Sequence, residues 1–383
     1  MFTHEIVIVG AGPAGSAAAL ELANLDPGLA ERLLLLDKAV FPRPKLCAGG
    51  LSVDTDSELR GLGVEIEIPA VPVHTTQFLL PTGRLTFNHR NQFRVVRRTD
   101  FDHYLLRAAK ARGVVVHEGE PVVDVVENQD QVIVQTSTSE YRAKILIAAD
   151  GANSKIRARL GLNRLGRLMI GMEIHSAFAD ASFNKLEENM AVLDLRILNH
   201  GVPGYCWVFP TVNENYREIS LGIMAAPFGS RELPALKTIF STWLKGFGLD
   251  SPNLKIASHP SLRYESKSAC SQNRVLLAGD AAGVDPLFGE GIVSALACGR
   301  VAAIAAFDAL QSNDFSFSNY EQRVRSSAIG SLMRRRRMIA RRLYEKPKLA
   351  HFLLKQDALI RGLALLHAYK YGGQITWEAG VVN

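Results

Sequence analysis

The chain has 383 residues, of which 47% are hydrophobic and 21% charged, and its formal net charge is +6. This length exceeds what one hydrophobic core usually fills, and the composition excludes a disordered protein. The small basic excess suits an anionic ligand or surface, and we expect no nucleic-acid partner. Four widely spaced cysteines without a C-x-x-C pair, in a chain without a secretory signal, predict a cytoplasmic protein with reduced thiols.

The N-terminal run "IVIVGAGPAGSAAALELA" has the pattern of a buried strand, a glycine-rich turn and a small-residue helix. Its glycines permit a tight turn, a close approach of the backbone to a pyrophosphate, and close helix packing. The next apolar run, "RLLLLDKA", ends in an acid that suits ribose hydroxyls. Together they are the fingerprint of a dinucleotide-binding domain. The predicted contacts are Gly10, Gly12, Pro13, Ala14, Gly15, Asp37 and Lys38.

Two later segments also end a predicted strand in an acid beside a glycine. "ILIAADGANSKIRARLG" ends at Asp150 and Gly151, and we expect Ser154 to cap the short helix that follows. "RVLLAGDAAGVDPLFGEGIVSALACG" ends at Gly279 and Asp280, and this aspartate suits a sugar-alcohol chain. The backbone amides that we expect to face a flavin ring belong to Gly289, Gly291 and Ile292.

In this order, the three motifs resemble those of FAD-dependent oxidoreductases of the aromatic-hydroxylase-like group, which is similar in fold to glutathione reductase. The resemblance implies FAD as the cofactor. In "RRTDFDHYLLRAA" it implies that Arg98 lies against the flavin nucleotide, with Arg97 as the alternative. It also implies that the strand backbone at Val122 or Val123 contacts the adenine.

Two more segments resemble the geranylgeranyl reductase family within this group. In "KLCAGGLS" a lysine-x-cysteine pair precedes glycines, although Ala48 stands where many members have another glycine. "YREISLGIM" keeps one glycine, Gly222, of a usual pair. In "PGYCWVFP" three alternating aromatic residues share one face of a strand. The resemblance implies cofactor contacts for Cys47, Ala48 and Gly49. It implies a substrate-binding wall of Tyr205, Trp207, Phe209 and Pro210.

The resemblance implies hydrogenation of carbon–carbon double bonds in a geranylgeranyl-type chain of a diphosphate, lipid or pigment ester. NADPH or another donor re-reduces the flavin. Because an isolated alkene accepts a hydride poorly, it must be protonated early, and the faces of Tyr205 and Trp207 suit the resulting positive charge. We interpret Cys47 as a thiol that tunes the flavin or relays a proton, with a structural role as the alternative. These three residues are the candidate catalytic residues, and no metal is expected.

Three other functions stay open at this point. The first is an FAD-dependent monooxygenase of the same fold, acting on a hydrophobic substrate. The second is a flavin halogenase, whose typical Trp-x-Trp-x-Ile-Pro strand "YCWVFP" imitates without matching. The third is a flavin-binding sensor or membrane-attached scaffold without catalytic activity.

The predicted fold is α/β, with a Rossmann-type parallel sheet, an antiparallel substrate sheet and a helical C-terminal segment. We assign residues 1–70, 93–160 and 268–310 to the FAD-binding domain, 71–92 and 161–267 to the substrate domain, and 311–383 to the helical segment. We expect Pro203 and Pro210 to end the aromatic strand. No uncharged apolar run reaches 18 residues, so no membrane-spanning helix is predicted.

The C-terminal segment contains the basic run "MRRRRMIARRLYEKPK", in which four consecutive arginines cover every face of a helix. Its two interpretations are a solvated basic helix and a surface for an anionic membrane lipid or a diphosphate head group. The strongly apolar run 349–371 follows and predicts a further helix. This helix suits a greasy substrate or an interfacial docking face, and packing against the body explains it equally well.

Overall fold

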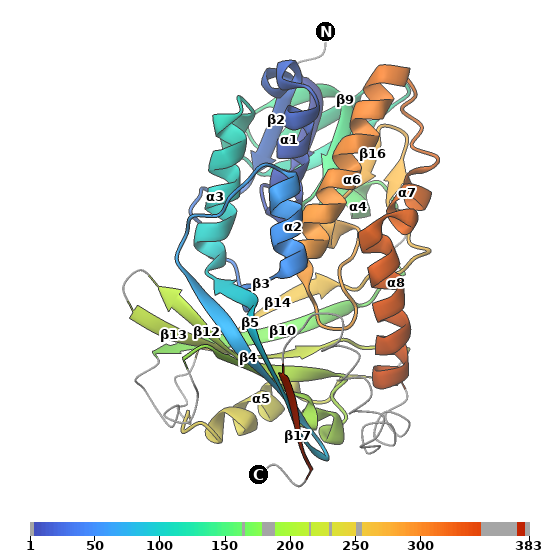
Figure 1. The fold of residues 1–383 in the computed structure, drawn as a ribbon. Helices are drawn as coiled ribbons and strands as arrows, with labels where there is room; N and C mark the ends of the chain where they lie inside the picture. Colours follow the sequence, from blue (N-terminus) through green and yellow to red (C-terminus); the bar gives the residue numbers. More distant parts are fainter. Residues whose placement is uncertain are drawn as a thin grey trace.

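The computed structural model describes residues 4–162, 165–177, 188–213, 216–229, 232–249, 255–345 and 374–379. Two sheets organise these residues, one among the upper helices and one in the lower half of the molecule (Figure 1). The mixed α/β fold with a helical C-terminal region is thereby confirmed. The predicted helix over 349–371 lies outside the described residues.

The upper sheet is built around the N-terminal strand. β1 lies between β2 and β9 and pairs in parallel with both, and every residue of β2 is buried. Continuous apolar runs are typical of parallel strands that are covered on both faces. Within the described residues this sheet has the order β15(Ser271–Gln272), β16(Val275–Leu277), β9(Glu140–Ala148), β1(His4–Val9), β2(Leu33–Asp37) and β6(Val115–Glu118), with β8(Val132–Thr136) and β7(Val122–Glu127) attached through β9.

Helices cover the upper sheet. They are α1(Pro13–Leu25), α2(Val53–Gly61), α3(Arg98–Ala111), α4(Lys155–Arg159) and α6(Gly291–Ser312). Helices α1 and α6 pack closely, since a Cβ atom at Gly299 would lie 2.2 Å from the carbonyl oxygen of Ala14. The small side chains of both helices therefore allow their backbones to touch.

Among the described helices, α6 is the one that is long and apolar enough to cross a membrane, and 72% of its apolar window is buried in the protein. This helix contains two charged residues, Arg300 and Asp308. Arg300 pairs with Glu21 and Glu58. The packing of α6 against α1 accounts for its apolar composition.

The lower sheet contains the aromatic strand. Its described strands follow the order β14(Ala257–Leu262), β10(Leu168–Ala177), β13(Tyr216–Ala225), β12(Gly204–Asn213), β11(Met190–Asp194), β4(Ala70–Leu80), β5(Gly83–Val96) and β17(Gln374–Ala379), and β3(Gly50–Ser52) also pairs with β5. The expected antiparallel sheet has one exception, because β11 and β4 run parallel. Helix α5(Leu236–Lys245) packs on one face of this sheet.

The strands fall largely, although not entirely, within the expected segments. All strands of the upper sheet come from 1–70, 93–160 and 268–310. However, β3 lies in the first of these segments and pairs in the lower sheet, and β5 runs past residue 93. The C-terminal segment has α7(Tyr320–Ser326), α8(Ala328–Ala340) and a π turn over Arg341–Glu345, but then returns as β17 to the edge of the lower sheet. The domain limits themselves stay a prediction.

Candidate flavin and substrate site

The glycine turn after β1 has the geometry of a nucleotide cradle. Gly10 has a φ of +101°, and a Cβ atom there would lie 2.3 Å from the oxygen of Ala149. A Cβ atom at Gly15 would lie 1.8 Å from the oxygen of Gly10. Beside Gly12, by contrast, the nearest described atom is Nη2 of Arg43 at 3.7 Å. The turn is therefore tightly packed at Gly10 and Gly15 but has free space beside Gly12. This space lies at the N-terminus of α1, where backbone amides attract phosphate.

Asp37 lies at the end of β2 and orients the same turn. Its Oδ2 accepts a hydrogen bond from the amide of Ala11 at 2.7 Å, and its Oδ1 accepts one from the amide of Ala39 at 2.8 Å. Each carboxylate oxygen has a further lone pair. The predicted ribose contact therefore remains compatible with this position. Lys38, which follows it, is exposed.

A second open position lies at the end of β9. Within the part of the chain that the structure describes, the buried Oδ1 of Asp150 has no hydrogen-bond partner, and no atom lies within 4 Å of a Cβ built at Gly151. Ser154 caps α4 as expected, accepting from the amide of Arg157 at 2.9 Å. Arg157 in turn donates to the oxygen of Ala281 at 2.9 Å, which ties this motif to the third one. An unpaired buried oxygen beside open space fits a polar ligand group.

Arg98, rather than Arg97, lies on the side of the nucleotide cradle. It forms a bidentate ion pair with the fully buried Asp102, at 2.7 and 2.8 Å, and Arg43 joins the same carboxylate at 3.1 Å. Burial lowers the pKa of Arg98, but Asp102 and Cys47 together raise it by more, so the net shift is upward. Arg97 instead pairs with Glu218 on β13. The contact of Arg98 with a flavin nucleotide stays a prediction.

The loop that carries Cys47 bridges the two sheets. The amide of Cys47 donates to Oε1 of Glu173 on β10 at 2.9 Å, and the amide of Gly49 donates to the Cys47 sulfur at 3.4 Å. The Cys47 thiol also lies near enough to Arg98 to help raise the pKa of that guanidinium. Gly49, at a φ of +79°, accepts from the amide of Val96 at 3.0 Å. The loop thus contacts the acid of the lower sheet through the Cys47 amide, and its thiol lies on the side of Arg98 in the upper body.

The motif around Asp280 meets the fingerprint at the same place. A Cβ atom at Gly279 would lie 2.6 Å from the Cβ of Ala14, and one at Gly291 would lie 3.9 Å from Oδ1 of Asp280. Burial raises the pKa of Asp280, and the charges of Lys45 and Arg98 oppose this shift. Predicted cofactor residues from three distant segments are therefore brought together.

The aromatic side chains of strand β12 lie on the face of the lower sheet that meets the loop of Cys47. Trp207 pairs with Gly222, which pairs with Glu173, so that the indole and the acid occupy the same face. A Cβ atom at Gly222 would lie 2.0 Å from Cζ2 of Trp207, which explains the glycine. The indole Nε1 donates to Oγ of Ser220 at 3.0 Å.

Tyr205 lies on the same face as Trp207, on the side of the segment that follows Asp280. Its hydroxyl donates to the carbonyl of Phe288, and burial raises its pKa well above the ordinary value. The Cys47 thiol lies close enough to contribute to that shift. Phe209 packs against Phe93, with ring centroids 5.4 Å apart. Because strand residues alternate, Cys206 and Val208 pack instead on the α5 side, as expected.

Pro210 does not end the strand, contrary to the expectation, since β12 continues to Asn213. The pairing of β12 with β11 ends at Val208. Pro210 therefore lies where the β11 side of the strand has no paired residue. A proline lacks the N–H that such a partner would need and is tolerated there. Pro203 lies just before the first strand residue, as predicted.

Glu173 and His259 lie at the site although no sequence motif predicts them. His259 lies over Gly171, where a Cβ atom would be 2.6 Å from its ring. Burial and then the charge of Lys45 lower the pKa of His259 to about 4. Within the described residues, its Nδ1 and Oε2 of Glu173 are buried without a hydrogen-bond partner. The one available signal was a glutamate inside the apolar run "LMIGMEIHSAF".

Other predicted positions are less informative. Val123 lies on β7 with its side chain 60% exposed, and nothing in the structure tests a backbone contact with adenine. Among the described side chains, no group of three or more His, Cys, Asp or Glu is arranged to hold a metal. All four cysteines are unbridged, and only Cys47 is partly exposed.

Comparison with known proteins defines the class of this flavin site. Residues 3–296 match the sequence family of the FAD binding domain. The open glycine cradle and the unpaired oxygen of Asp150 fit this cofactor. The chain is therefore an FAD-dependent oxidoreductase.

Individual relatives define the family. A digeranylgeranylglycerophospholipid reductase of Methanopyrus kandleri is 30% identical, over 82% of this chain and 79% of its own length. A menaquinone reductase of Mycolicibacterium smegmatis is 29% identical, over 78% of this chain and 75% of its own. A geranylgeranyl bacteriochlorophyll reductase-like protein from Thermoplasma acidophilum has a similar fold, with a TM-score of 0.77 at 20% identity, covering 97% of this chain and all of that one. The chain belongs to the geranylgeranyl reductase family of FAD-dependent oxidoreductases.

Proposed function

We propose that this protein hydrogenates carbon–carbon double bonds in a geranylgeranyl-type isoprenoid chain, in the cytoplasm and with NADPH as the electron donor. The observation that carries the proposal is the apolar face of Trp207 and Tyr205 beside the loop of Cys47. The names of the reductase relatives from Methanopyrus and Mycolicibacterium support an isoprenoid lipid or quinone as the substrate class.

The reaction adds two hydrogens across one double bond. The glycine turn after β1 and the motifs at Asp150 and Asp280 would hold FAD, which would supply the two-electron chemistry that delivers a hydride equivalent from NADPH to one alkene carbon. The other carbon takes a proton from a group of the protein or from solvent, so that charge and atoms balance. Aromatic faces stabilise the positive charge that develops on carbon, by about 2 kcal/mol or more when water is excluded.

The structure suggests which residues serve these needs. Trp207 is 4% exposed and fixed by Ser220 and Gly222, so its face does not reorganise when charge develops. The Tyr205 phenol stays protonated because burial raises its pKa. The Cys47 thiol, close to both Arg98 and Tyr205, is the candidate proton relay.

The direct test uses the holoprotein with its flavin reduced under anaerobic conditions. Geranylgeranyl diphosphate or a geranylgeranyl lipid ester is added, and the products are analysed by mass spectrometry. The proposal expects a gain of two hydrogens per reduced double bond, together with oxidation of the flavin.

Other outcomes favour the alternatives. Oxygen-dependent hydroxylation of an added substrate, without alkene reduction, would identify a monooxygenase, and halide-dependent halogenation would identify a halogenase. A reduced flavin that stays unreactive toward every acceptor would leave the binding-only sensor or scaffold.

We further propose that the outward face of α8 and of the π turn after it contacts anionic lipid. The four arginines do not all face solvent, because Arg336 and Arg337 pair with carboxylates of the body. The exposed arginines of this region surround the side chains of Met338 and Ile339, which are about half exposed. A hollow of about 450 Å³ lies beside them. This face comprises Arg334, Arg335, Met338, Ile339, Arg341 and Arg342. A basic surface with an apolar centre complements a negatively charged bilayer.

Vesicle sedimentation tests this contact. The protein should bind vesicles of phosphatidylglycerol mixed with phosphatidylcholine and not those of phosphatidylcholine alone, since each arginine near the surface contributes roughly 1 kcal/mol. The double variant Arg334→Glu and Arg335→Glu should lose this binding, whereas Arg323→Glu on α7 should keep it. Equal binding to both kinds of vesicle, or no effect of the double variant, would contradict the contact.

A further inference from the structure

The loop Asp285–Glu290 contains Gly289, one of the three residues that we expect to face the flavin ring, and leads directly into the other two, Gly291 and Ile292, at the start of α6. It connects the turn at Asp280 to α6. Asp285 is 1% exposed and organises the loop from inside. Its Oδ1 accepts from the amide of Leu287 at 3.0 Å, and its Oδ2 accepts from the amides of Phe288 and Glu290 at 3.1 and 3.2 Å.

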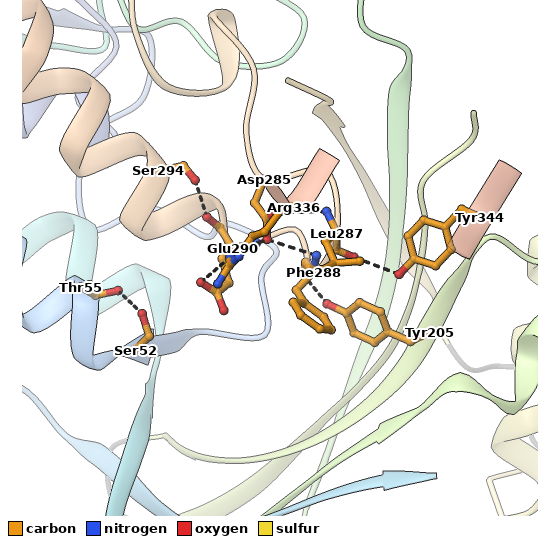
Figure 2. Close-up of polar contacts among 10 residues, drawn as sticks. All are labelled: Ser52, Thr55, Tyr205, Asp285, Leu287, Phe288, Glu290, Ser294, Arg336 and Tyr344. Carbon is orange, nitrogen blue, oxygen red and sulfur yellow. Dashed lines mark hydrogen bonds and ion pairs between the residues drawn. The ribbon is translucent and has the colours of Figure 1, made fainter. Parts of the chain in front are cut away.

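Arg336 of α8 and Tyr344 of the turn after it bind this loop from outside (Figure 2), and we call their contacts the grip. Nη1 of Arg336 contacts Oδ2 of Asp285 at 2.9 Å and Oε2 of Glu290 at 2.8 Å. The hydroxyl of Tyr344 donates to the carbonyl of Leu287 at 3.0 Å. Tyr205 of the aromatic strand holds the next carbonyl, that of Phe288. Three side chains from outside the loop thus fix four of its residues.

Charge makes Arg336 the central part of this grip. Two carboxylates in one short loop repel each other, and a single guanidinium that is 17% exposed lies against both. Burial lowers the pKa of Arg336, but Asp285 and Glu290 raise it by more. Without this cation, three amide hydrogen bonds alone would compensate the buried charge of Asp285, and its repulsion with Glu290 would favour movement of the loop toward water.

We infer that Arg336 is a positioning residue for the flavin, acting through Asp285 and Glu290 on the amides of Gly289, Gly291 and Ile292. Arg336 and Tyr344 lie outside residues 3–296, which match the FAD binding domain, so α8 and the turn after it complete a site whose other parts come from the matched region. The inference requires FAD to bind here and is independent of the substrate that the flavin reduces.

The test compares Arg336→Met with Arg336→Lys in the holoprotein. The methionine removes the charge at similar length, and the lysine retains it. The matched control is Arg323→Met, which breaks the exposed ion pair with Asp308 on α6. For each variant we would measure the FAD dissociation constant, the visible spectrum of the bound flavin, and hydrogen exchange of the loop amides.

With Arg336→Met, the FAD dissociation constant should rise by about tenfold or more, the flavin spectrum should shift and the loop amides should exchange faster. Arg336→Lys should recover most of the spectrum, and Arg323→Met should match the unmodified protein. A folded Arg336→Met protein with unchanged affinity, spectrum and exchange would overturn the inference. Equal effects of the Arg336 and Arg323 variants would do so too.

If Arg336→Met does not fold, Tyr344→Phe decides the question. This change removes one hydrogen bond to the loop and retains the ring. A shifted flavin spectrum with faster exchange at residues 287–289 would support the grip. An unchanged spectrum and unchanged exchange would refute it.

Discussion

Trp207 occupies the space that a side chain at position 222 would need, so the indole and the glycine form one unit. The ring is also held by Ser220, and its neighbour across two strands is Glu173. A buried tryptophan with a fixed ring presents a flat apolar face with little freedom to turn. At the scale of single residues, this unit is the most specific part of the proposed substrate wall.

Replacing Trp207 by alanine should lower the rate of alkene reduction by at least about tenfold and leave FAD content unchanged. The loss of stability should be about 3–5 kcal/mol, as for other buried aromatic residues. The measurements are single-turnover reduction of the isoprenoid, flavin absorbance per protein, and urea unfolding.

The matched control is Trp243→Ala on α5. Trp243 stacks on Phe240 and donates to Asp194, on the opposite face of the sheet. The Trp243→Ala protein should lose stability in a similar way but keep its rate of alkene reduction per bound flavin. If the two variants lose alkene reduction equally, the aromatic face is core and nothing more.

The sequence predicts some of these residues better than others. The turn glycines are predictable because steric demands at Gly10 and Gly15 arise within a few residues of chain. Glu173 and His259 are not, since neither belongs to a local motif and their meeting depends on the register of β10 with β14. Likewise, Arg336 lies in an arginine run that looks uniform, and only the fold shows which member faces Asp285.

At the scale of elements, the loop 43–49 depends on β10 for its position. The one hydrogen bond described above between its Cys47 amide and the Glu173 carboxylate joins the upper body to the lower sheet. The carboxylate is 1% exposed, so solvent does not replace it readily. Strand β10 thus presents the loop to the aromatic wall.

Glu173→Ala should release this loop, because the Cys47 amide loses its acceptor. Hydrogen exchange at residues 47–49 should accelerate several-fold, and alkene reduction should fall more than FAD affinity. Glu173→Gln retains a carbonyl oxygen and should restore most of the protection. Slow exchange in Glu173→Ala would show that the contacts of Gly49 hold the loop without the acid.

Element types were easier to predict than element partners. Alternating and continuous apolar runs identified the strands around β1, β9 and β12, because those patterns are local. The parallel pairing of β11 with β4 and the return of β17 to β5 join segments separated by long stretches of chain. No local pattern encodes such pairings.

At the scale of the whole molecule, His259 links stability to pH. Its pKa is about 4 in the folded protein, lowered by burial and the charges of Lys45 and Arg98 and opposed by Glu173, against a usual 6.5. Between these pH values the unfolded chain binds the additional proton. The free energy of unfolding should therefore fall as the pH drops from about 6.5 to about 4, by up to about 1.4 kcal/mol per pH unit from this group.

Urea unfolding of the holoprotein at a series of pH values checks this slope. The variant His259→Asn should show a shallower decrease over the same interval, because the titrating group is gone. Titrating groups away from His259 contribute equally to both proteins, so the comparison isolates the histidine together with its coupling to Glu173. Identical slopes would mean that His259 is protonated in the folded protein as readily as in the unfolded one.

The contact between α1 and α6 also concerns the order in which the nascent chain matures. The ribosome makes the fingerprint long before α6, yet Ala14 touches Gly299 in the finished protein. At about 5–20 residues per second, α6 leaves the ribosome roughly 15 to 60 s after α1. During that interval the apolar side of α1 lacks its partner and is exposed to chaperones and to aggregation. A fragment that stops before residue 291 therefore contains the nucleotide motif but lacks the helix that packs against it.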